Sequence, residues 1–148
     1  MKKNRILLFI LILIGIGLAV AVGVGLYLYN KAPESLKNKE SDFTITARDL
    51  YTQYETNETN ADQQYLDKVL EVSGNVVEIL ENSDTQLTLL LGEADQLSGV
   101  SCTIDKLNSP FANEVQVNDY IILRGRCTGK LMDVVLIDCI IQNIKKHE

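Results

Sequence analysis

The feature that most constrains this sequence is an apolar run at residues 6–29, which holds 24 consecutive residues without a charge. A helix of that length extends about 36 Å at 1.5 Å per residue, and the hydrocarbon core of a bilayer is about 30 Å thick. Three basic residues lie among residues 1–5, and Tyr27 and Tyr29 close the run as interfacial aromatic residues do. We therefore predict a short basic tail followed by one transmembrane signal-anchor helix at residues 6–29, with the N-terminus inside.

A cleaved signal peptide is the competing interpretation of the same run. Ala19, Val20 and Ala21 form an A-x-A pattern that places a cleavage site after Ala21. The apolar run continues through Leu28, whereas a processed protein normally becomes polar after its cleavage site, so the anchor is favoured.

Small residues recur every fourth position on one side of the predicted membrane helix, at Gly15, Ala19 and Gly23. Such rows let helix backbones approach closely in lipid, where packing rather than hydrophobicity drives association. These residues are candidates for helix association in the membrane, although glycine and alanine are also simply common in membrane helices.

A polar stretch of mixed charge at residues 30–42 follows, and we interpret it as a linker with nothing to bury. A helix is predicted to begin after Thr46, whose hydroxyl can cap it, with Asp49 three residues further along. An apolar row at helical spacing follows and is diluted by the polar residues 55–60. The pattern predicts one short helix packed on a larger body.

After residue 65 the apolar period changes from helical to two, which predicts strands separated by turn residues. The predicted strands cover residues 69–79, 86–91, 100–104, 120–127 and 133–144. Ser109 followed by Pro110 predicts a short helix at residues 109–115, between the third and fourth strands. This order fits a mainly β fold, a five-stranded OB-fold Greek-key barrel. The helix and barrel fill residues 43–144, before a polar tail at residues 145–148.

Gly74 lies in the middle of the first predicted strand, which must curl sharply to serve both halves of such a barrel. We expect Gly74 to permit that bend or a bulge. In the last strand, alternation points Val135, Ile137, Cys139 and Ile141 inward and Asp138 outward.

The three cysteines permit a structural inference from strand pairing. If Thr128 pairs with Asp133, Cys127 and Cys139 are offset by five residues, or about 16 Å, which is too far for a disulfide. In OB barrels the third strand lies beside the fifth, so Cys102 and Cys139 are the expected pair in an oxidising compartment. Three buried thiols without a bond are an equally weighted alternative.

Several short motifs lie within residues 46–144. They are Ala61-Asp62, KVLEVSG at residues 68–74, VSC at residues 100–102, RGRCTG at residues 124–129, and Asp138-Cys139. With them the chain resembles the tRNA_anti-like family, OB-fold proteins that are named for their similarity to anticodon-binding domains. Many of these proteins are bacterial and anchored or exported, so the resemblance implies an OB fold and a place in the bacterial envelope. It does not establish RNA binding.

One departure from the expected pattern precedes the fourth strand. Asn118 stands in the turn where glycine is expected, and asparagine is the residue best able to replace glycine in a left-handed conformation. The turn is therefore predicted to survive.

An OB barrel usually binds its ligands on its second and third strands. The outward side chains predicted there are Thr88, Leu90, Ser101 and Thr103, and this candidate binding face holds no aromatic platform for bases. The chain after the apolar run has 11 basic and 20 acidic side chains, a formal charge of −9. Nucleic-acid binding is therefore disfavoured.

Catalysis, cofactors and metals have no support in the sequence. The sole histidine, His147, lies in the tail, and the cysteines are separated by 24 and 11 residues without a C-x-x-C motif. We therefore predict a protein that is not an enzyme and has no metal or cofactor.

These observations predict a noncatalytic binding or scaffold module that engages a protein partner. A single pass would anchor it in the bacterial inner membrane, with the soluble domain on the periplasmic, extracytoplasmic side. One alternative is an oligonucleotide-binding OB domain on the cytoplasmic side. Another is a module that senses a small molecule or oligosaccharide through a pocket near Thr88, Ser101 and Thr103.

Overall fold

A computed structural model of the chain describes residues 15, 17, 20–25, 36, 40–93 and 98–146. The chain divides into two units, Met1–Glu34 and Ser35–Glu148. In the first unit residues 20–25 are helical, and no helix among the described residues is both long and apolar enough to cross a membrane. Most of the predicted span at residues 6–29 lies outside the described residues, as does Ala19. Gly15 and Gly23 are helical and exposed.

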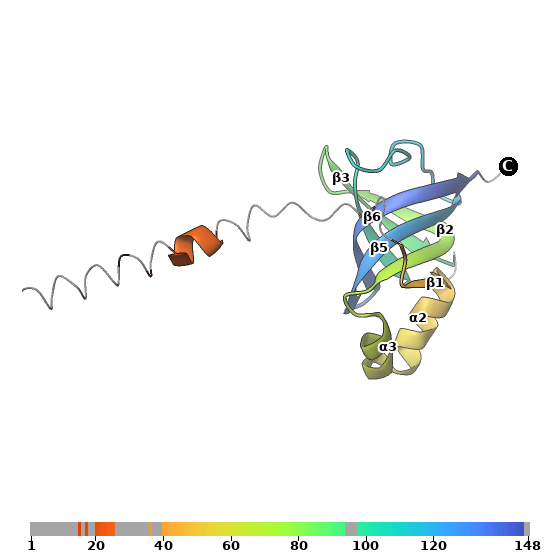
Figure 1. Ribbon diagram of the computed structural model, residues 1–148. Coiled ribbons are helices and arrows are strands. Elements are labelled where there is room, and N and C mark those ends of the chain that lie inside the picture. The colour runs from red at the N-terminus through yellow and green to blue at the C-terminus, as the bar shows by residue number, and fades with distance from the viewer. Residues whose placement is uncertain are drawn as a thin grey trace, which may run out of the picture. The chain divides into compact units, whose positions relative to one another are not determined.

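The second unit contains a closed barrel of five strands (Figure 1). The strands are β2 (Val69–Glu81), β3 (Gln86–Gly92), β4 (Val100–Asp105), β5 (Tyr120–Lys130) and β6 (Val134–Lys145). Their order is β2-β3-β4-β6-β5, and pairing of β2 with β5 closes the ring. Only the β4–β6 pair among these is parallel. The predicted OB-type barrel is confirmed, and each predicted strand is found with bounds that differ by only a few residues.

Two helices lie together at one end of the barrel (Figure 1). The first, α2 (Ala47–Thr56), begins where predicted, because the Thr46 hydroxyl accepts a hydrogen bond from the Asp49 amide at 3.1 Å. The second, α3 (Glu58–Tyr65), is capped by the side chain of Asn57. The prediction of a single helix is wrong because the polar stretch that dilutes the apolar row contains a second N-cap.

A short strand that the sequence did not reveal precedes α2. This strand, β1 (Phe43–Thr46), pairs in parallel with residues 70–73 of β2. Residues 43–46 read FTIT and alternate apolar and polar side chains, but four residues are the shortest run that indicates a strand, so the pairing with β2 defines it.

The long strand β2 curls as predicted. Its residues 69–75 pair with β5, and its residues 75–81 pair with β3. The register shift lies between Val76 and Glu78, after Gly74. A Cβ added to Gly74 would lie 2.9 Å from the Cβ of Ala47, so this glycine makes room for the start of α2.

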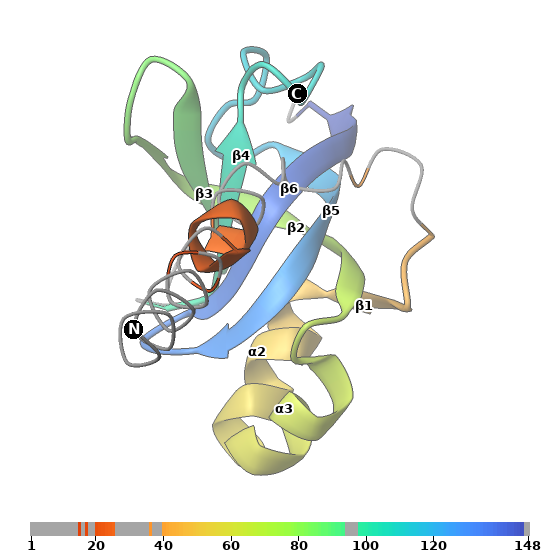
Figure 2. The same ribbon diagram turned by 60° about the vertical axis from the view of Figure 1, so that its left-hand side comes forward.

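The segment from Ser109 to Val115 forms successive turns instead of the predicted helix (Figure 2). Amide hydrogen bonds run from Ala112 to the Ser109 carbonyl at 3.2 Å and from Glu114 to the Phe111 carbonyl at 3.0 Å. The Ser109 hydroxyl does not cap this segment, because it is buried and accepts the amide of Ile141 in β6 at 3.1 Å. After these turns Asn118 has a φ of 74°, as the sequence predicted.

Strand β6 changes its inward positions along its length. Val134 and Leu136 face the core, so the prediction that Val135 and Ile137 point inward is wrong. Asp138 has a φ of 55°, and this irregular residue shifts the register so that Cys139 and Ile141 face the core as predicted. A simple period of two cannot reveal such an insertion.

The predicted linker is fastened to the barrel at two points. The Leu36 side chain is fully buried in a separate cluster with Val69 and Ile140. At Asp42 the amide donates to the Val69 carbonyl at 2.7 Å, and the carboxylate accepts the Val69 amide at 2.8 Å. The expectation that the linker has nothing to bury is therefore wrong at Leu36.

Candidate binding surface

The four residues predicted as a binding face lie next to one another on the outer surface of β3 and β4. Thr88 is directly opposite Thr103, and Leu90 is directly opposite Ser101. All four side chains are half-buried. The structure therefore assembles them as two cross-strand pairs on one surface, which we call the β3–β4 face.

Two further residues extend this face, and the sequence did not reveal them. Leu80 of β2 is opposite Thr88 and is 50% exposed, and Val135 of β6 is opposite Ser101. Leu80 lies beyond the predicted end of its strand, and Val135 was predicted to face inward. The sequence analysis missed both residues because the face on which each lies depends on where a bulge shifts the register of its strand.

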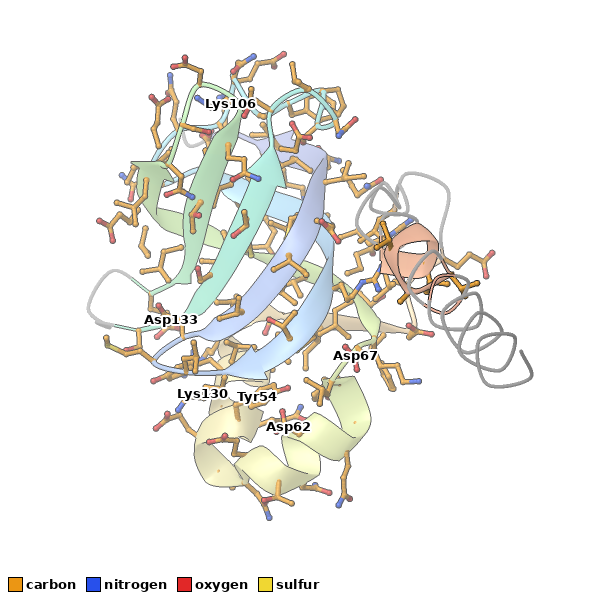
Figure 3. All side chains as sticks on the ribbon, turned by 90° about the vertical axis from the view of Figure 1, so that its left-hand side faces the viewer. Tyr54, Asp62, Asp67, Lys106, Lys130 and Asp133 are labelled. Atoms are coloured by element: carbon orange, nitrogen blue, oxygen red, sulfur yellow. The ribbon has the colours of Figure 1, made fainter. Side chains whose placement is uncertain are left out.

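The border of the β3–β4 face is polar. Asn82 donates a 2.7 Å hydrogen bond to the Thr88 hydroxyl, and Lys106 forms a 3.1 Å ion pair with Glu81. Lys106 lies at the end of the barrel away from the helices (Figure 3). The face thus combines half-buried aliphatic and hydroxyl groups with the exposed Leu80 inside a rim of amide and charged groups, the composition typical of protein interfaces.

Five of the described basic side chains form ion pairs with carboxylates. The pairs are Arg48–Glu93, Lys106–Glu81, Arg124–Glu71, Lys130–Glu55 and Lys146–Asp119. Paired cations contribute little positive potential to the surface. These residues do not assemble the continuous basic groove that a nucleic-acid backbone requires.

A groove of about 420 Å³ lies between β1 and α2, away from the β3–β4 face. Its lining residues are Thr44, Ile45, Thr46, Asp49, Thr52, Gln53 and Ser73. Six of these seven side chains carry a hydroxyl, amide or carboxylate group that can hydrogen-bond with a ligand, while carbon atoms make up most of the exposed lining. Sequence reasoning missed the groove because it missed β1.

The cysteines are buried free thiols. Burial raises the pKa of the Cys127 thiol, and burial together with the neighbouring Cys102 thiol raises the pKa of Cys139. A thiol with a raised pKa stays protonated at neutral pH and is a poor nucleophile. The Cys127 and Cys139 thiols therefore lack the activation that a catalytic cysteine needs.

The predicted pairing of the last two strands is wrong. Cys127 is opposite Leu136 rather than Val134, because the hairpin turn is wider than predicted and Lys130 is opposite Val134. Cys139 lies beside Gly125, two residues from Cys127 along β5 instead of the predicted five. The predicted pairing of Cys102 with Cys139 stays a prediction.

Comparison with known proteins matches the chain to one family over residues 1–141, described as tRNA_anti-like. Among solved structures, that of a putative aspartyl-tRNA synthetase from Leishmania major Friedlin is similar, with a TM-score of 0.46 and 12% identity. The similarity covers 76% of this chain and 22% of that chain, so this protein spans about a fifth of the length of the synthetase. No curated protein matches the chain.

Proposed function

The chain belongs to the tRNA_anti-like family, and from this premise we propose that it is a noncatalytic OB-fold module that binds a protein partner through its β3–β4 face. The observation that carries the proposal is the pairing of Thr88 with Thr103 and of Leu90 with Ser101 on one outward surface. Leu80, which is 50% exposed, adds an aliphatic group beside Thr88.

The chemistry of this face favours a protein over a single-stranded nucleic acid. Proteins that bind single strands stack bases on aromatic side chains within a basic groove. The described aromatic residues come from other parts of the fold: Phe43, Tyr51, Tyr54, Tyr65, Phe111 and Tyr120. Glu78, which is exposed and opposite Leu90, would repel phosphate groups at this face.

We also propose that residues 6–29 anchor the module in the bacterial inner membrane, with the barrel on the extracytoplasmic side. The 24-residue uncharged run and the basic residues before it support this proposal. A barrel held there meets envelope proteins and no cellular RNA.

Site-specific photocrosslinking in intact cells tests the partner. A photoreactive benzoylphenylalanine at Leu90 should give an adduct of defined mass with a protein, and Leu80→Asp should weaken that adduct. The matched control places the same probe at Thr128, which is exposed on β5. Equal adducts from both positions, or an adduct that ribonuclease removes, would contradict the proposal.

A topology measurement tests the anchor. The chain should stay in the membrane after alkaline carbonate extraction, and a cysteine at position 147 should react with a membrane-impermeant maleimide in spheroplasts. Protection of that cysteine until the membrane is lysed would place the barrel inside and restore oligonucleotide binding as the leading function.

The groove between β1 and α2 supports a second candidate function, the sensing of a small polar or oligosaccharide ligand. Its hydroxyl and amide groups can hydrogen-bond with a polyhydroxylated molecule, and Asp49 can accept from its hydroxyl groups. Thermal-shift screening of neutral sugars should then show stabilisation that Thr44→Val and Gln53→Ala abolish. Stabilisation that survives both substitutions would place the ligand elsewhere.

A further inference from the structure

The hairpin between β5 and β6 ends in two exposed apolar side chains. Leu131 is 87% exposed and Met132 is 75% exposed. Glycine, asparagine, aspartate and serine normally occupy such turns, because they suit the turn backbone and are well solvated. Two adjacent bulky apolar residues at a turn therefore require an explanation beyond the turn itself.

The base of this hairpin tip is fixed to the rest of the fold. The Leu131 amide donates to the Asp133 carbonyl at 3.0 Å, and the Asp133 carboxylate accepts the Gly99 amide at 2.9 Å. Lys130 forms an ion pair with Glu55 of α2, and its ammonium lies 5.6 Å from the ring centroid of Tyr51. Leu131 and Met132 are thus held on a supported projection, not on a long loop.

The tip lies at the helix-bearing end of the barrel. Figure 3 shows Lys130 and Asp133, which flank the tip, near Tyr54 and far from Lys106. Leu107, the next residue after Lys106, is 80% exposed at the opposite end. Among the described residues, each end of the barrel therefore has an exposed leucine, but only the hairpin end has two adjacent exposed apolar side chains.

The Leu36 contact limits how far this hairpin can lie from a membrane anchor. Leu36 packs on Val69, which is opposite Arg126, and on Ile140, which is opposite Arg124. These positions lie about 13–20 Å from Lys130, the last residue of β5 before the tip, at about 3.3 Å per residue along the strand. From residue 29, the end of the predicted membrane helix, seven residue steps lead to Leu36 and span about 25 Å at most. The hairpin tip and the membrane surface are thus within reach of each other.

We propose that Leu131 and Met132 insert into the lipid–water interface of the membrane that anchors the chain. This inference rests on the anchor of the proposed function. The transfer of leucine and methionine side chains from water to an apolar environment is favourable. A supported tip also loses little conformational entropy when it inserts.

The charge around the tip defines which lipid surface fits. The helices beside it carry Glu55, Glu58 and Asp62, so an anionic surface does not attract this end of the barrel. Insertion should therefore occur on zwitterionic phosphatidylcholine, and neither added anionic lipid nor lower salt should strengthen it.

The absence of tryptophan from the sequence makes a direct test simple. Met132→Trp gives a reporter at the tip alone, and Leu107→Trp gives a matched reporter at the far end. The full chain is reconstituted in phosphatidylcholine vesicles with and without brominated phosphatidylcholine, which quenches tryptophan in the bilayer. The tip tryptophan should emit at shorter wavelength and be quenched, while the tryptophan at position 107 should show neither change. Leu131→Asp in the Met132→Trp chain should remove most of the quenching.

Flotation of the same vesicles separates this inference from the anchor. A chain that floats while its tip tryptophan stays unquenched overturns tip insertion and leaves the anchor intact. A chain that does not float overturns both. Equal quenching at positions 107 and 132 overturns the inference in favour of unspecific adsorption. A shift of the emission wavelength that occurs without lipid and depends on protein concentration also overturns the inference, because it shows that the tip contacts a second copy of the chain.

Discussion

The hydroxyl of Tyr54 lies 3.4 Å from the sulfur of Cys127, so a buried hydrogen bond joins α2 to β5. Burial raises the pKa of both groups, and the nearby Asp62 carboxylate raises that of Tyr54 further. Cys139, buried in the same core, also has a raised pKa. The folded barrel therefore holds these three protons more tightly than the unfolded chain does.

Alkaline pH should destabilise the fold. A raised pKa gives stability that is complete below the unfolded value and is lost as pH rises above it, here from about pH 9 for the thiols and pH 10 for Tyr54. Each group should remove about 1.4 kcal/mol per pH unit from the free energy of unfolding. Urea unfolding in nonionic detergent between pH 7 and pH 11 measures this loss. Tyr54→Phe should cost about 1 kcal/mol at pH 7 and make the decline above pH 10 shallower; an unchanged slope would contradict the assignment.

Gly125 should not tolerate a side chain while Cys139 is present. A Cβ at position 125 would lie 2.5 Å from the Cys139 sulfur, so Gly125→Ala should destabilise the barrel by about 1–3 kcal/mol. Cys139→Ala removes that sulfur. In a double-mutant cycle monitored by urea unfolding, the double variant should be more stable than the sum of the single effects predicts. Simple additivity would show that the crowding arises from Leu136 and the backbone.

The buried Leu36 should hold the segment before β1 against the barrel. Leu36→Ala should cost about 2 kcal/mol and speed proteolytic cleavage within residues 30–42, because the contact with Val69 and Ile140 is lost. Leu36→Met keeps most of the buried volume and serves as the control. Equal cleavage rates for Leu36→Ala and the native chain would mean that the contact does not restrain the segment.

The cysteine pairing can be decided by mass analysis without reduction. Cys102 and Cys139 lie on neighbouring strands, where Ile104 is opposite Cys139 and the two thiols interact. Chain purified from an oxidising envelope should yield linked peptides that contain these two residues, with Cys127 free. A link between Cys127 and Cys139 would contradict this prediction, and three free thiols would favour the reduced alternative.

The sequence predicted the parts of the fold that local chemistry determines. Thr46 caps α2 because its hydroxyl and the amide of Asp49 are fixed by sequence spacing alone. The strands followed from alternation, which held throughout β3 and β4 because no irregular residue interrupts them. The candidate face was predicted in these two strands, where register is simplest.

The rest depended on tertiary contacts. Ser109 has the chemistry of a helix cap, but its hydroxyl accepts the Ile141 amide of β6. No local sequence pattern predicts this hydrogen bond. Leu36 stands alone in a polar segment, so its burial follows only from where Val69 and Ile140 emerge on the barrel. The groove between β1 and α2 could not be predicted, because β1 is defined by its pairing with β2.

The left-handed Asp138 makes the number of residues in β6 matter to the docking of another segment. Because this one residue lets Cys139 and Ile141 face inward, the intervening Ile140 is left on the outside, where Leu36 covers it. Deleting a single residue there would turn Ile140 toward the barrel interior and remove the site that receives Leu36. Among related sequences, the spacing across this strand should therefore distinguish chains in which the segment before β1 is docked on the barrel from chains in which it is not.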